Sequence, residues 1–204
     1  NVKEIAKGIG LDGRIGNKFL HAGPGYGGSC FPKDTRSLAY TGRENGAPQS
    51  LVETVIKVNE KIKTRMIDKI LEACDGDVSN KTVCFLGVTF KPNTDDIREA
   101  PSLTIIPSLV RKKAVIRVVD PQGETEGKKN LKKVLWFDSP YTAAVDADCI
   151  VILTEWNQFR ALNLKKISKV MKAPRMVDLR NVYEKNIVIS SGFEYYQSKS
   201  QKKQ

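Results

Sequence analysis

The feature that most constrains the fold is an alternation of short apolar runs with helix-like segments, which begins near residue 82. We expect strands over 82–90, 114–120, 134–137, 149–153 and 176–179, with helices over 100–112, 141–146 and 164–171. Strands that alternate with helices form a parallel sheet with crossover helices. The apolar runs suit strands that are buried on both faces. The pattern therefore predicts an α/β domain with a parallel sheet.

A long helix precedes this domain. Apolar residues recur there at spacings of three and four and so form one face of a helix; they are Leu51, Val55, Val58, Ile62, Met66, Ile70 and Cys74. Short helices are expected over 2–9 and 34–40, with a helix end and restart at 44–48. The turn-rich segment 75–80 is the expected boundary. This divides the chain into a helical segment over 1–78, the sheet domain over 79–197, and a disordered basic tail over 198–204.

Composition narrows the classes of function. The net charge of +11 suits anionic partners such as a diphosphate. Nucleic acid is not an expected partner, because the basic residues are scattered and lack an interleaved aromatic motif. The apolar runs are shorter than a membrane span. Four cysteines without a CxxC pair, and a single histidine, give no metal site and favour a reducing cytoplasm.

The segment 23–34 carries the clearest chemistry. Its glycines let the backbone bend sharply and approach a ligand closely. Cys30 follows them beside Lys33, and a neighbouring cation favours the reactive thiolate. Asp34 is placed to orient or deprotonate a water. These are the parts of covalent catalysis on a carbonyl carbon.

The same glycines do not form a dinucleotide fingerprint. Gly23, Gly25 and Gly27 have the right spacing, but we expect no buried strand before them and no helix directly after Gly28. Ligands of open parallel sheets bind beyond the carboxyl ends of the strands. Phe90 and Lys91, Glu155 and Trp156, and Arg180 fall at such ends, where cations can pair with phosphates and an aromatic ring can pack on a base. Asp120, at another strand end, is expected to cap a turn.

Several motifs resemble one family in both residues and order. They are residues 10–20 (GLDGRIGNKFL), 27–34 (GGSCFPKD), 85–99 (FLGVTFKPNTDDIRE), 154–159 (TEWNQF) and 178–181 (DLRN). On these motifs the chain resembles the nucleotide-sugar 6-dehydrogenases, typified by UDP-glucose 6-dehydrogenase. The resemblance implies a central helical segment with a long spine helix, followed by a Rossmann-like, UDP-binding domain. It also implies a separate NAD-binding domain N-terminal to such a segment, so that this chain alone is expected to be inactive.

The resemblance implies roles for individual residues. Cys30 would form a thiohemiacetal and then a thioester with the sixth carbon of the sugar, and Asp34 would help to activate the hydrolytic water. The implied cofactor is NAD, near Lys33 and Arg98. The implied substrate contacts are Arg14 from a neighbouring subunit, His21, Gly23, Gly25, Tyr26, Gly27, Phe90, Lys91 and Arg180.

Plainer interpretations stand beside these. Lys91 as a solvated strand end, Arg180 as a salt-bridge residue, and Arg98 paired with Asp95 or Glu99 would be structural rather than functional. The loop sequence favours a UDP-glucose enzyme over a GDP-mannose enzyme. A non-catalytic nucleotide-binding or dimerisation module is the alternative from another class. The resemblance further implies a homo-oligomer, in the simplest case a dimer through helix 51–74.

Overall fold

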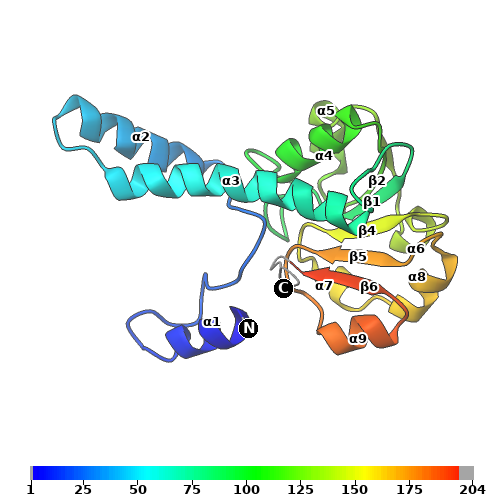
Figure 1. Cartoon of the computed structure of the whole chain (residues 1–204). Helices are drawn as coiled ribbons and strands as arrows, with labels where there is room; N and C mark the ends of the chain where they lie inside the picture. Colours follow the sequence, from blue (N-terminus) through cyan, green and yellow to red (C-terminus); the bar gives the residue numbers. More distant parts are fainter. Residues whose placement is uncertain (1, 198–204) are drawn as a thin grey trace.

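The computed structural model describes residues 2–197, so the predicted basic tail lies outside the described residues. Three helices precede the sheet: α1 (Val2–Gly10), α2 (Cys30–Glu44) and α3 (Ser50–Ala73). Helices α2 and α3 run side by side and extend away from the sheet domain, while α1 lies apart from them (Figure 1). The predicted helix end and restart at 44–48 is confirmed by the turn that joins α2 to α3.

The predicted parallel α/β sheet is confirmed. Its strands are β1 (Thr82–Leu86), β2 (Val115–Val119), β3 (Val134–Trp136), β4 (Cys149–Ile152), β5 (Arg175–Asp178) and β6 (Glu194–Gln197). They lie in the order β3-β2-β1-β4-β5-β6, and every neighbouring pair is parallel. The chain reverses its direction of progress between β1 and β4, which is the switch point where doubly wound sheets bind ligands.

Helices cover both faces of the sheet. They are α4 (Ser102–Arg111), α5 (Glu124–Asn130), α6 (Pro140–Ala143), α7 (Asn157–Arg160), α8 (Leu164–Val170) and α9 (Lys185–Ser190). The apolar pattern did not predict α5, α7, α9 or β6. Helix α5 is polar along its length, and its position depends on a distant contact: Gly127 packs under the ring of Trp136. A contact of that kind leaves no periodic signal in the sequence.

Two apolar clusters fill the domain, one on each face of the sheet. The first combines α4 and the second half of α3 with alternate strand residues such as Phe85 and Val151. The second combines α6 to α9 with the other strand residues, such as Leu86 and Ile152. The core of the sheet domain therefore includes part of the long helix. The division of the chain at residue 78 stays a prediction.

The apolar face of α3 is buried along only part of the helix, whereas the spacing of its apolar residues predicted one continuous face. Met66 and Ile70 are buried, but Leu51 is 83% exposed, and Val55 and Val58 are also exposed. The stripe has one period along the whole helix, yet only its second half lies against the sheet (Figure 1). The first half presents its apolar residues on the surface.

The first strand is shorter than predicted, because β1 ends at Leu86 rather than at Phe90. Gly87 follows with φ of +89°, and a Cβ there would lie 2.4 Å from Thr154. The Asp120 carboxylate accepts from Val88 N, just after this turn. It also accepts from Gly123 N, in the turn that follows β2. The prediction that Asp120 caps a turn is confirmed.

Within residues 2–197, no helix combines the length and the apolar character that a membrane crossing needs.

Candidate functional site

Cys30 is the first residue of α2, and its side chain is exposed. The expectation that no helix starts directly after Gly28 is therefore wrong. Gly28, at φ of +88°, turns the chain just before the helix. Pro32 lies in the first helical turn, where a residue without an N–H is tolerated because that group has no partner within the helix. The thiol thus lies at a helix N-terminus, where the peptide dipoles favour negative charge.

The glycine-rich loop is packed between the long helix and the sheet domain. A Cβ at Gly25 would lie 2.8 Å from Asn59 Oδ1 on α3, and one at Gly27 would lie 2.7 Å from the carbonyl oxygen of Glu99. At Gly28 a Cβ would lie 2.9 Å from the ring of Phe90. The loop therefore needs glycine at these places because the backbone itself is in contact on both sides.

The segment after β1 forms one wall of this site. Gly28 N donates to the carbonyl of Arg98 over 2.8 Å. The Arg98 guanidinium donates to both carboxylate oxygens of Asp96, at 2.9 and 2.8 Å, and this raises the pKa of Arg98. The alternative interpretation of Arg98 as a local ion-pair residue has the wrong partners, because Arg98 pairs with Asp96 rather than with Asp95 or Glu99. Glu99 pairs instead with Arg36 of α2, at 2.9 Å. The wall is thus tied both to the loop and to α2.

Two cations lie around the Cys30 thiol. Lys33 Nζ is 2.5 Å from Asp34 Oδ1, and this hydrogen bond is the main reason that the pKa of Lys33 is raised. The charge of Cys30 contributes in the same direction to the pKa values of Lys33 and Arg98. Asp34, predicted to act on a water, accepts this hydrogen bond from Lys33, and both side chains are exposed.

Arg180 joins the sheet to the glycine-rich loop. It follows β5, and its Nε donates to Leu153 O over 2.9 Å while Nη2 donates to Phe90 O over 3.0 Å. Nε also lies 3.1 Å from Glu155 Oε2 as an ion pair, and only 13% of the Arg180 side chain is exposed. Burial lowers the pKa of Arg180, and the Glu155 charge opposes that effect. A Cβ at Gly23 would lie 2.8 Å from Nη1, so the loop backbone rests on the guanidinium.

A cavity of about 670 Å³ opens beside Arg180, between the N-terminal segment and the sheet domain. His21 lines it, together with four further basic side chains and Arg180 itself; the four are Lys3, Lys7, Lys18 and Arg160. The concentration of positive charge in one hollow suits an anionic ligand. Its size is within the range of ordinary ligand pockets.

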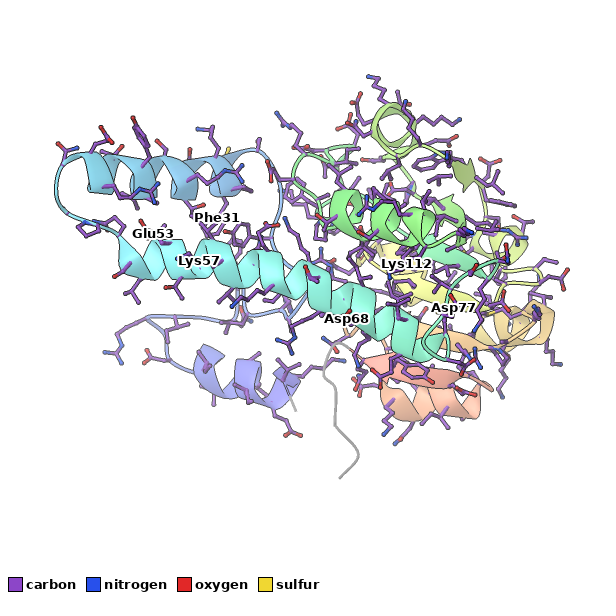
Figure 2. All side chains as sticks on the ribbon, turned by 45° about the horizontal axis from the view of Figure 1, so that its top comes forward. Phe31, Glu53, Lys57, Asp68, Asp77 and Lys112 are labelled. Carbon is purple, nitrogen blue, oxygen red and sulfur yellow. The ribbon has the colours of Figure 1, made fainter. Side chains whose placement is uncertain are left out.

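Of the other predicted site residues, some contact the glycine-rich loop or the segment after β1, and others lie on the surface or in the core. Tyr26 contacts the ring of Phe31 edge to face, with centroids 4.7 Å apart. Phe31 belongs to the first turn of α2 and lies on the side of that helix that faces α3 (Figure 2). Lys91 Nζ lies 5.2 Å from the centroid of the Phe90 ring. Arg14 is not brought to the centre: its side chain is 90% exposed and pairs with Asp12. Trp156, considered as a base-packing ring, is buried in the core instead.

Sequence reasoning missed three residues of the site. Asn59 bonds the loop backbone, Asp96 holds Arg98, and Glu99 joins the wall to α2. Asn59 gave a weak signal, as a polar residue beside the apolar stripe of the long helix. Among the described residues, no group of three or more histidine, cysteine or acidic side chains is arranged to hold a metal ion.

Two family descriptions match successive parts of the chain. Residues 1–61 match the central domain of the UDP-glucose/GDP-mannose dehydrogenase family, and residues 84–185 match its UDP binding domain. The first range contains Cys30 and the glycine-rich loop. The second contains Phe90, Arg98 and Arg180.

Individual relatives agree with this match. A UDP-glucose 6-dehydrogenase of Rhizobium meliloti is 48% identical over 195 residues, which are 96% of this chain and 45% of the relative. One from Rickettsia conorii is 41% identical over 198 residues, 96% of this chain and 46% of the relative. A solved UDP-glucose dehydrogenase from Pyrobaculum islandicum superposes with a TM-score of 0.81 at 30% identity, covering 95% of this chain and 42% of that one. The chain spans about half the length of these relatives, and it belongs to the UDP-glucose/GDP-mannose dehydrogenase family.

Proposed function

We propose that this chain forms the C-terminal part of an NAD-dependent UDP-glucose 6-dehydrogenase, which oxidises UDP-glucose to UDP-glucuronate. One observation carries the proposal: an exposed thiol at the N-terminus of α2 lies on a loop that is bonded to the domain matching the family's UDP-binding domain. A nucleophile and a nucleotide-binding domain are thus held together by the Gly28 to Arg98 hydrogen bond. The similarity to UDP-glucose 6-dehydrogenases supports the choice of sugar.

Cys30 is the proposed nucleophile. A first oxidation would convert the alcohol at the sixth carbon of the sugar to an aldehyde, with NAD as the hydride acceptor. The thiolate of Cys30 would then add to that carbon and form a thiohemiacetal. Removal of a hydride from that carbon leaves a thioester, and a water that Asp34 positions hydrolyses it to the carboxylate and the free thiol. A thioester stays activated toward water, which is the advantage of sulfur at this position. Lys33 and the start of α2 favour the thiolate that begins the sequence.

The nucleotide sugar would lie along the glycine-rich loop. Residues 21–27 would contact the sugar through backbone groups, and Phe90, Lys91 and Arg180 would hold the UDP portion. The contact between Gly23 and the Arg180 guanidinium supports this assignment, because it brings the two binding elements together. The basic cavity beside Arg180 adds positive charge for a diphosphate.

The cofactor we propose is NAD, which would accept the hydride in each oxidation. Lys33 and Arg98 would lie near its phosphates. The fit is chemical: Lys33 is an exposed cation in the first turn of α2, and Arg98 is an exposed cation whose carbonyl is bonded to Gly28, just before that helix N-terminus, where anions bind readily. We propose that turnover needs the NAD-binding part that the relatives carry, so that this chain by itself does not turn over.

We further propose a dimer through the long helix in a reducing cytoplasm. The exposed apolar residues in the first half of α3, Leu51, Val55 and Val58, support an interface there. Arg14, which is exposed and pairs with Asp12, would reach the sugar site of the neighbouring subunit. The free state of all four cysteines supports a reducing compartment.

The test is a chimera in which this chain replaces the matching C-terminal part of the Rhizobium meliloti relative. We expect NAD reduction with UDP-glucose, and its loss by roughly a thousandfold or more in Cys30→Ser, as for other nucleophile variants. Ser37→Ala, on the exposed surface of α2, is the matched control and should keep full activity.

The outcomes separate the candidates. Unchanged turnover in Cys30→Ser would exclude the covalent route. Turnover with GDP-mannose in place of UDP-glucose would promote the alternative sugar named in the family description. A chimera that folds and binds UDP-glucose but never reduces NAD would favour a non-catalytic nucleotide-binding module.

A further inference from the structure

Asn59 is a buried polar side chain on the long helix, only 5% exposed. Its amide makes two hydrogen bonds to the backbone of a single residue, Tyr26. Oδ1 accepts from Tyr26 N over 2.8 Å, and Nδ2 donates to Tyr26 O over 3.3 Å. A side chain that satisfies both the donor and the acceptor of one peptide residue acts there in place of a neighbouring strand.

The loop is shaped to receive this side chain. Gly25 has φ of +115°, and a Cβ there would lie 2.8 Å from Asn59 Oδ1 and 3.5 Å from Cγ of Lys63, one turn further along α3. Any larger residue at Gly25 would push the loop away from the helix. The position of Asn59 and the glycine at 25 therefore depend on each other.

The Asn59 contact is one of two supports of the segment that leads to Cys30. On the other side, Gly28 N bonds the carbonyl of Arg98, and the Phe90 ring packs on Gly28. Tyr26 also touches Phe31, the residue after the cysteine. Three residues separate Tyr26 from Cys30, and this segment has contacts on both sides. Freeing one side lets the segment that leads to Cys30 move.

We infer that Asn59 is a positioning residue for Cys30: it fixes the loop at Tyr26 and so fixes the place where α2 begins with the thiol. The catalytic importance of Asn59 rests on the proposed function, because it assumes that Cys30 is the nucleophile. The two hydrogen bonds between Asn59 and Tyr26 lie within this chain, so their effect on the loop can be measured without enzyme activity.

The experiment compares Asn59→Leu and Asn59→Asp with the parent 204-residue chain. Leucine has a similar volume but makes neither hydrogen bond. Aspartate keeps an acceptor for Tyr26 N, although it loses the donor to Tyr26 O and adds a charge beside Lys63 and Glu60. The rate of hydrogen exchange at Tyr26 N measures the strength of its hydrogen bond to Asn59. The rate of Cys30 alkylation by iodoacetamide measures how that hydrogen bond affects the reactivity of the thiol.

We expect the protection of the Tyr26 amide to fall about tenfold or more in Asn59→Leu, and to be kept largely in Asn59→Asp. Alkylation of Cys30 should slow about threefold or more in Asn59→Leu, because the thiolate is no longer held in one place at the N-terminus of α2, and should recover toward the parent rate in Asn59→Asp. Ile67→Ala is the matched control: it opens a space in the core on the same helix, lowers the melting temperature, and should leave both readouts unchanged.

Two results would overturn the inference. Unchanged protection of Tyr26 in Asn59→Leu would mean that the contact does not hold the loop. Lost protection with an unchanged alkylation rate would mean that the contact holds the loop but not Cys30. Failure of the proposed function is read separately, from the turnover of the Cys30→Ser chimera.

Discussion

The amide of Gly28 donates to the carbonyl of Arg98 over 2.8 Å, and this bond joins the loop that carries Cys30 to the segment that follows β1. The two residues belong to different matched parts of the family, the central domain and the UDP binding domain. The site is thus assembled across the two parts, and its geometry depends on how they pack.

The glycine at 28 should be irreplaceable by alanine. Gly28 and Gly46 both have positive φ, but a Cβ at Gly28 would lie 2.9 Å from the Phe90 ring, whereas nothing lies within 4 Å of one at Gly46. Gly46→Ala should cost about 1 kcal/mol for its backbone alone. Gly28→Ala should cost a further 1–3 kcal/mol or so, as overpacking does. Urea unfolding measures both variants, and equal costs would show that the ring moves aside freely.

Removal of the Arg180 guanidinium should destabilise the sheet domain. Arg180→Met leaves the Glu155 carboxylate, only a quarter exposed, without its cation, and it removes the donors to Leu153 O and Phe90 O. We expect a loss of about 3 kcal/mol of unfolding free energy. The second change Glu155→Gln should restore part of that loss in the double variant. If the double variant is no more stable than Arg180→Met, the unpaired charge is not the cause.

Alkaline pH should unfold the protein partly through Tyr183. This phenol is buried, its hydroxyl donates to Phe159 O, and burial raises its pKa to about 12 from an ordinary value near 10. A raised pKa in the folded state gives stability that is complete below pH 10 or so and is lost as the pH rises toward about 12. Tyr183→Phe should be less stable at pH 7, because Phe159 O loses its donor, but should lose less stability between these pH values. Thermal melting across that range checks both signs.

The apolar start of the long helix should control assembly. Changing both Leu51 and Val55 to glutamate puts two charges on the exposed face and should shift a dimer to monomer in sedimentation velocity. Lys57→Glu changes the net charge by the same amount on the same helix (Figure 2) and should leave the dimer intact. A monomeric parent, or dissociation by both changes alike, would count against an interface on this face.

Much of the fold was predictable because the strands carry a local signal. Buried parallel strands read as continuous apolar runs, and the predicted positions of β2, β4 and β5 agree with the structure to within one or two residues. Short polar elements such as α5 carried no such signal, because their helical form depends on packing against Trp136. The end of β1 was missed for a related reason: a glycine turn and the Asp120 carboxylate, from another strand end, stop it.

The sequence by itself determined which reactive side chains the candidate site carries, namely a cysteine after glycines with a lysine and a carboxylate in the next turn, and it contains the motifs that place the chain in its family. Only the tertiary structure decided the partners. It assigned Asp96 to Arg98, Glu99 to Arg36 and Asn59 to Tyr26, and it buried one half of the long helix while leaving the other exposed. The physical reason is that helical and strand periods record which face of an element is apolar, whereas partners are set by contacts between residues far apart in the chain.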